Sequence, residues 1–177
     1  MSQRGEAIVL IGFMGSGKSS VGRHLAQRLR CRRYDTDELV VASLGLSIAE
    51  IFAQLGEETF RNAETEALKK IPEGRGVIVT GGGIVLRDAN VRILRQLGTV
   101  VQLTASESVL VERVSRRATR PLLRTENPRA TVAELLALRQ PFYRAAADFV
   151  IDTSTLRHEE VADAVLEKIE QTRHRPG

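Results

Sequence analysis

Eight residues near the N-terminus have the types and the spacing of a loop that binds phosphate. The segment Gly12–Ser19 reads GFMGSGKS and fits the pattern G-x-x-x-x-G-K-[ST]. Glycines let such a loop turn successive backbone N–H groups toward phosphate oxygens, and the N-terminus of the following helix adds partial positive charge. Lys18 can reach the β- and γ-phosphates, and the Ser19 hydroxyl can ligate Mg²⁺. We therefore expect a nucleoside triphosphate to contact Gly15, Ser16, Gly17, Lys18, Ser19 and Ser20.

The phosphate loop alone does not say whether the γ-phosphate passes to water, to a metabolite or to nothing. Five further motifs follow it, and each has an ordinary explanation when it is taken singly. An acidic pair can cap a helix, an isolated arginine is usually solvated, and a run of glycines can form a plain loop. In chain order the motifs are Asp35-Thr36-Asp37, Phe60-Arg61-Asn62-Ala63-Glu64, Gly81-Gly82-Gly83, Arg120-Pro121-Leu122-Leu123 and Arg139-Gln140-Pro141-Phe142-Tyr143-Arg144.

In this order and at these spacings the chain resembles the shikimate kinases, P-loop enzymes that phosphorylate the 3-hydroxyl of shikimate. The resemblance runs from about Ala7 to the last predicted helix. It implies that ATP and Mg²⁺ are the cofactors, that shikimate is the small-molecule substrate, and that shikimate 3-phosphate and ADP are the products. It also implies a monomeric, cytoplasmic enzyme of aromatic amino-acid biosynthesis.

The resemblance assigns roles to residues on the acceptor side. Arg61 and Arg139 match two arginines that bind the substrate carboxylate, a group that a guanidinium holds through two parallel hydrogen bonds. The family places this carboxylate beside the middle glycine, here Gly82. Asp37 matches the carboxylate that accepts hydrogen bonds from the ring hydroxyls, so it is our choice for orienting the attacking hydroxyl or taking its proton. Asp35 matches the residue that holds Mg²⁺ through water.

Two arginines are expected on the nucleotide side. Arg120 matches the arginine of a mobile lid, at about 117–130, that reaches the ATP phosphates; its charge would stabilise the transferring group while closure excludes water. Arg113 aligns with a position that packs near the adenine, although a place on a helix surface explains it equally well. The segment 152–158, which should border the adenine, lacks the proline that some family members carry there, and its Arg157 is one position displaced from their arginine.

Strands and helices that alternate along the chain must position these residues. Short apolar segments predict strands at Ala7–Ile11, Val77–Thr80, Thr99–Leu103 and Phe149–Ile151. We expect Arg33–Thr36 to form a short second strand. Periodic apolar positions predict helices at Lys18–Leu29, Glu38–Leu44, Ile48–Leu55, Glu57–Lys70, Ala89–Leu97, Thr131–Ala147 and His158–Thr172, with a further one that Ser106 caps and that runs to about Arg116. This alternation predicts an α/β fold with a parallel sheet covered on both faces.

The expected organisation is one domain over residues 1–177, since no linker separates two cores. The resemblance makes it a three-layer P-loop kinase fold with a central sheet of five parallel strands. It also implies a helical substrate-binding segment at about 37–70 and the lid at about 117–130. The last strand ends in the segment that should border the adenine.

The composition argues against several other functions. The chain is basic, with a formal charge of +4, and 22 of its 26 basic residues are arginines, but acidic residues are interspersed among them. Five Phe, two Tyr and no Trp supply few platforms for stacked bases, so we expect no nucleic-acid partner. No apolar run is long enough for a membrane span, and the lone Cys31 excludes an internal disulfide. The histidines His24, His158 and His174 have no metal-ligand spacing, and we expect them on helix surfaces.

Two alternatives to a shikimate kinase remain to be tested. A related small-metabolite kinase, such as a gluconate kinase, would also act on a polyol with one carboxylate, although the full motif set favours shikimate. A regulatory module that binds a small acid or a nucleotide without turnover would not need the transfer groups Lys18, Ser19, Asp35 and Asp37, which are all present.

Overall fold

A computed structural model describes residues 5–116 and 127–173 of the chain. Its strands form one parallel sheet of five in the order β2-β3-β1-β4-β5, which confirms the predicted sheet. Parallel strands end at the same edge, so the loops that follow β1, β2 and β3 meet there. The strands are β1 (Ala7–Ile11), β2 (Arg33–Asp35), β3 (Val77–Val79), β4 (Gly98–Thr104) and β5 (Phe149–Asp152).

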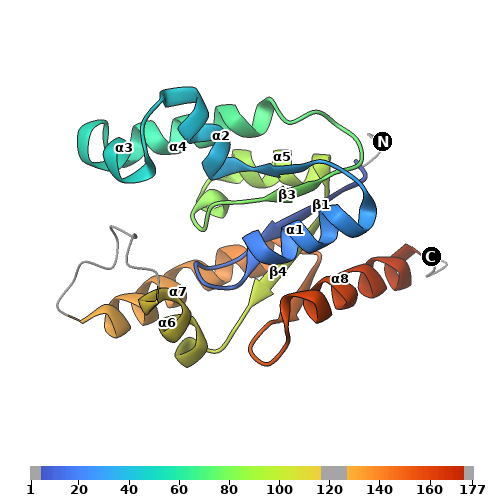
Figure 1. The fold of residues 1–177 in the computed structure, drawn as a ribbon. Helices are drawn as coiled ribbons and strands as arrows, with labels where there is room; N and C mark the ends of the chain where they lie inside the picture. Colours follow the sequence, from blue (N-terminus) through green and yellow to red (C-terminus); the bar gives the residue numbers. More distant parts are fainter. Residues whose placement is uncertain (1–4, 117–126, 174–177) are drawn as a thin grey trace.

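Helices cover both faces of this sheet, as expected from β1 and β3, which are apolar and buried along their whole length. Helices α1 (Lys18–Leu29) and α8 (His158–Arg173) pack together on one face, seen in blue and red in Figure 1. Side chains of β1 alternate between the two cores, with Ile8 and Leu10 on the α1 and α8 side. The opposite core is covered by α5 (Asp88–Leu97), α6 (Glu107–Ser115) and α7 (Pro128–Ala146).

A group of three helices follows β2 and lies at one end of the molecule, shown in cyan and green in Figure 1. These are α2 (Thr36–Leu44), α3 (Ile48–Gln54) and α4 (Gly56–Lys69). They share a small apolar core of their own, which contains Val40, Ile51, Phe60 and Ala67. This group covers the predicted substrate-binding segment at 37–70, and its first helix begins directly beside the carboxyl edge of the sheet.

Three local predictions need correction. Residues 128–130, expected in the lid, form the first turn of α7, because Pro128 suits the start of a helix and the Asn127 side chain accepts from the N–H of Ala130 at 3.2 Å. Residues 117–126 of the predicted lid, which include Arg120, lie outside the described residues. Ser106 precedes α6 but makes no capping hydrogen bond with its side chain, and a short 3₁₀ helix at Ile84–Leu86 was not predicted. Within the described ranges, no helix is long and apolar enough to span a bilayer.

Candidate active site

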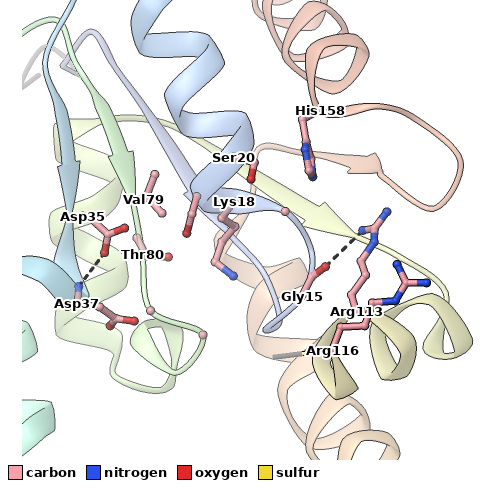
Figure 2. Close-up of a pocket in the computed structure, with 14 residues that line it drawn as sticks. Gly15, Lys18, Ser20, Asp35, Asp37, Val79, Thr80, Arg113, Arg116 and His158 are labelled. Atoms are coloured by element: carbon pink, nitrogen blue, oxygen red, sulfur yellow. Dashed lines mark hydrogen bonds between the residues drawn. The ribbon is translucent and has the colours of Figure 1, made fainter. Parts of the chain in front are cut away.

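A cavity of about 400 Å³ opens where the loops after β1, β2 and β3 meet. Figure 2 shows Asp35 and Asp37 at one end of it, Arg113 and His158 at the other, and Lys18 between them. Of the predicted nucleotide contacts in the described residues, all but Ser16 line the cavity, as do Asp35, Asp37 and Gly82. Its walls are formed by Gly15, Gly17, Lys18, Ser19, Ser20, Asp35, Asp37, Val79, Thr80, Gly81, Gly82, Arg113, Arg116 and His158.

The loop between β1 and α1 has the backbone that its glycines predict. Gly15 and Gly17 have φ of +81° and +95°, in the left-handed region that disfavours a side chain. Lys18 begins α1, and its Nζ donates to the carbonyl oxygens of Gly12 at 2.7 Å and Phe13 at 2.9 Å. The ammonium group is therefore held over the loop, beside the cavity, where phosphate oxygens would bind.

The Arg113 side chain ties this loop to the segment after β5. Its Nη1 donates to the Gly15 carbonyl at 3.3 Å and to Thr153 Oγ1 at 3.0 Å, and its Nη2 donates to the Thr153 carbonyl at 2.8 Å. Thr153 is buried, and its hydroxyl also lies 3.1 Å from the Ser16 carbonyl. Arg113 is thus not a solvated helix residue, because its guanidinium joins the phosphate loop to the segment after β5. Thr153 was not singled out from the sequence, because its partners are forty or more positions away.

Asp35 combines the two interpretations that its sequence allowed. Its Oδ1 accepts from the N–H groups of Asp37 at 3.1 Å and Glu38 at 3.4 Å, so it caps α2. Its Oδ2 accepts from Arg33 Nη1 at 3.0 Å. The carboxylate nevertheless lines the cavity together with Ser19. The cap therefore fixes the orientation of an acidic group at the site.

The three glycines after β3 each lie against a different polar group. A Cβ at Gly81 would lie 2.6 Å from Asp37 Oδ1 and 2.8 Å from a carboxylate oxygen of Glu64. A Cβ at Gly83 would overlap the guanidinium of Arg61. Gly81 and Gly83 are therefore required by close approach to charged side chains, whereas a Cβ at Gly82 would meet its neighbours at 3.6 Å, an ordinary van der Waals contact. The glycine run brings Asp37, Arg61 and the cavity into one small region.

Arg61 and Arg139 are both buried, with 8% and 7% of their surface exposed, so neither is the solvated helix residue that each would be if taken alone. Neither is in the wall of the cavity. Arg139 Nη1 lies 3.6 Å from the position that a Cβ on Gly82 would occupy, directly behind the glycine loop. Guanidinium groups at this depth are little screened by solvent, which strengthens their interaction with an anion.

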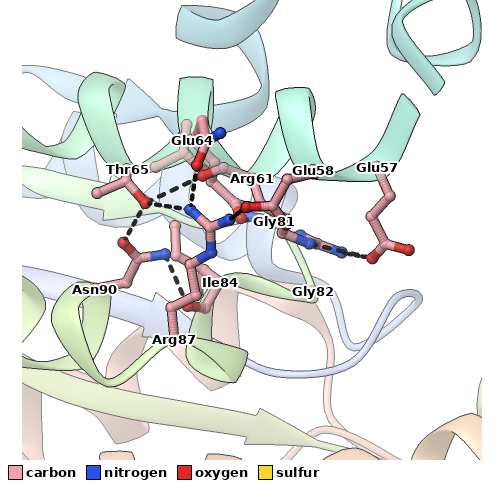
Figure 3. A network of polar contacts seen from close by, with 12 residues as sticks. Glu57, Glu58, Arg61, Glu64, Thr65, Gly81, Gly82, Ile84, Arg87 and Asn90 are labelled. Carbon is pink, nitrogen blue, oxygen red and sulfur yellow. Dashed lines mark hydrogen bonds and ion pairs between the residues drawn. The ribbon is translucent and has the colours of Figure 1, made fainter. Parts of the chain in front are cut away.

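A polar network surrounds Arg61, as Figure 3 shows. Its Nη1 donates to Glu64 Oε2 at 3.0 Å, and its Nη2 donates to Glu57 Oε1 at 3.1 Å. Glu64 is fully buried, whereas the Glu57 side chain is 61% exposed. Sequence reasoning gave Glu64 no role, although its position three residues after Arg61 in the same helix was a signal that the two side chains meet.

The pKa of Glu64 is raised from 4.5 to about 7, chiefly by burial; Arg61 opposes this shift, and the nearby charge of Asp37 contributes to it. Between these two pH values the folded protein keeps a proton that the unfolded chain has released. The free energy of unfolding that Glu64 contributes therefore falls as the pH rises through this range.

Glu64→Gln is expected to remove this pH dependence, because glutamine is neutral throughout. In urea unfolding, the stability of the wild type relative to Glu64→Gln should fall by about 1–3 kcal/mol between about pH 5 and about pH 8. Glu57→Gln is the matched control, since it removes the exposed partner of the same guanidinium. If the free energies of unfolding of the wild type and Glu64→Gln differ by the same amount at both pH values, the pKa of Glu64 is not raised.

A five-stranded parallel sheet with a phosphate-binding loop after β1 and a cavity beside that loop defines a P-loop nucleotide-binding protein. A family model described as Shikimate kinase matches residues 14–170. The shikimate kinase of Thermodesulfovibrio yellowstonii is 47% identical over 165 residues, which cover 93% of this chain and 95% of that protein.

Solved structures agree with this match. The shikimate kinase from Acinetobacter baumannii in complex with shikimate has a TM-score of 0.91 at 34% identity, and the alignment covers 98% of this chain and 97% of that one. The enzyme from Aquifex aeolicus has a TM-score of 0.80 at 35% identity, with 95% and 98% covered. The chain belongs to the shikimate kinase family and is an ATP-dependent phosphotransferase.

Proposed function

We propose that this protein transfers the γ-phosphate of Mg·ATP to the 3-hydroxyl of shikimate. The observation that carries the proposal is the glycine loop after β3. Asp37 lies against its first glycine, and the buried guanidinium groups of Arg139 and Arg61 lie near its second and third. Such a site suits a small ring that has a carboxylate at one end and hydroxyls at the other. The family resemblance is the support for a monomeric enzyme of the cytoplasm.

At the acceptor end, the carboxylate would bind beside Gly82, with Arg139 and Arg61 supplying the positive charge. Asp37 and Gly82 both line the cavity. Asp37 would therefore accept a hydrogen bond from the attacking hydroxyl and orient that hydroxyl toward the γ-phosphate. Little deprotonation of the nucleophile is needed early in a loose phosphoryl-transfer transition state, so orientation is the larger part of this role.

At the nucleotide end, backbone N–H groups of the loop would bind the phosphates, with Lys18 moving its donated hydrogen bonds from the loop carbonyls to phosphate oxygens. His158 and Arg113 line the end of the cavity opposite Asp35 and Asp37, where the base would lie. His158, expected on a helix surface, is exposed but borders this site, because α8 begins beside the phosphate loop. Arg120 remains assigned to the phosphates by resemblance alone.

Ser19 and Asp35 fit the demands of Mg²⁺. The part of the chain that the structure describes has no cluster of three or more acidic, histidine or cysteine residues that could hold a metal by itself. Mg²⁺ usually binds through one or two protein oxygens together with nucleotide phosphates and waters. When bound, it would neutralise charge on the phosphates. Ser19 would supply a direct oxygen, and Asp35 would act through water.

The position of the phosphate on the product tests this proposal. Shikimate and Mg·ATP are incubated with the purified protein, and the product is examined by ¹H–³¹P correlation NMR. Coupling of phosphorus to the proton on carbon 3 is the expected result. Phosphate on another hydroxyl, or hydrolysis of ATP with no phosphorylated acceptor, would overturn it.

Arg139→Ala is expected to raise the KM for shikimate by about 30-fold or more, because removing one partner of a buried ion pair costs about 2–5 kcal/mol. The KM for ATP should stay near that of the wild type. Arg144→Ala is the control, since Arg144 lies on the same helix but is exposed. Steady-state kinetics with each substrate varied in turn measure both constants. An unchanged KM for shikimate in both Arg139→Ala and Arg61→Ala would remove the carboxylate site.

A further inference from the structure

Tyr143 is completely buried, and its hydroxyl donates a hydrogen bond to the carbonyl oxygen of Gly82. Burial raises the pKa of Tyr143 to about 12, so the phenol keeps its proton and remains a donor at neutral pH. A buried tyrosine normally finds a partner for its hydroxyl, and most such partners belong to the general scaffold. Here the partner is the glycine that borders the cavity.

The same phenol oxygen lies next to Arg139. The position of a Cβ on Gly82 would be 3.6 Å from both Tyr143 Oη and Arg139 Nη1. The guanidinium also lowers the pKa of Tyr143, against the larger effect of burial. Arg139 and Tyr143 are four residues apart in α7, so they lie on the same face of that helix.

Three consecutive glycines need external contacts to hold one conformation, because glycine restricts its own backbone least. The N–H of Gly81 donates to Thr36 Oγ1 at 3.0 Å, and the Gly83 carbonyl accepts from Leu86 at 3.1 Å. Tyr143 holds the middle residue. A trans peptide points its N–H opposite to its C=O, so this bond turns the Gly83 N–H away from the buried phenol.

We propose that Tyr143 is a positioning residue for the acceptor, whose hydroxyl holds the Gly82–Gly83 peptide and the Arg139 guanidinium in the geometry that receives a carboxylate. This inference rests on the proposed function of the glycine loop. The phenol does not touch the reacting atoms. Its loss would therefore weaken acceptor binding and leave nucleotide binding and phosphoryl transfer largely intact.

Tyr143→Phe removes one oxygen and keeps the ring that packs in the core. We expect the KM for shikimate to rise about three- to ten-fold, the range for one lost hydrogen bond, with kcat and the KM for ATP within about two-fold of the wild type. Tyr34→Phe is the matched control, because Tyr34 is the other of the two tyrosines and lies on β2, with Arg32 over its ring. A lower melting temperature with an unchanged KM for shikimate would show a purely structural role.

A second measurement uses the wild-type protein and does not depend on how well the variant folds. Tyrosine labelled with ¹³C at Cζ gives two signals, which Tyr34→Phe assigns. Shikimate should shift the Tyr143 signal and leave that of Tyr34 in place. If shikimate stimulates ADP release but moves neither signal, the inference about Tyr143 is wrong. If shikimate stimulates no ADP release from the wild type, the proposed function fails instead.

Discussion

Replacing Lys18 with methionine is expected to lower kcat for shikimate-dependent ADP formation by about 1,000-fold. Methionine keeps an apolar stem of similar length but removes the ammonium that is held beside the cavity on the carbonyls of Gly12 and Phe13. Loss of one preorganised group that stabilises transition-state charge costs about 100- to 1,000-fold, and loss of a full positive charge on the phosphates lies at the upper end of this range.

The control for this variant is Lys168→Met, which makes the same change on the exposed side of α8. Lys168→Met should retain wild-type kcat. Circular dichroism and the melting temperature show whether Lys18→Met folds, because Lys18 also donates two hydrogen bonds to the loop. A folded Lys18→Met enzyme with kcat within tenfold of the wild type would exclude Lys18 from phosphoryl transfer.

Asp37→Asn is expected to lower kcat by about 100-fold or more, the lower end of the range for a positioned general acid or base. Asparagine has the same shape, but it cannot accept a proton, and its carbonyl oxygen is a weaker acceptor than a carboxylate. Asp37 Oδ1 lies in the narrow space beside Gly81, so a larger replacement would disturb the glycine loop as well.

Glu38→Gln, next to Asp37 on α2, is the control, since the Glu38 side chain is 66% exposed and pairs with Arg33. Rapid-quench measurement of a single turnover separates chemistry from product release. An unaltered rate of the chemical step in Asp37→Asn would show that the carboxylate neither orients the hydroxyl nor takes its proton.

The strands and the phosphate loop could be predicted from local sequence, because each depends on residues that are close together in the chain. Fully apolar runs such as Ala7–Ile11 predict strands that are buried on both faces, and β1 is such a strand. The loop motif likewise contains all the glycines that its backbone needs. Helix ends were less accurate: α2 begins at Thr36 rather than Glu38, because the cap is Asp35.

The supporting residues of the site could not be predicted, because their roles depend on partners that are distant in sequence. Thr153 joins the phosphate loop to β4, and Tyr143 joins α7 to the glycine loop. Composition does not show that Glu64 is buried, which is what makes its carboxyl unusual. The resemblance to a family supplied the roles of Arg61 and Arg139; the residues by themselves favoured solvated side chains.

The most direct test of the central claim is ADP release from Mg·ATP by the purified wild-type protein with a panel of acceptors. Shikimate, quinate and gluconate are supplied separately and compared with a reaction that has no acceptor. Shikimate should stimulate ADP release far above the reaction without acceptor, and gluconate should not. Stimulation by gluconate with none by shikimate would contradict the account, and ADP release that no acid stimulates would show that this site transfers no phosphate to these acceptors.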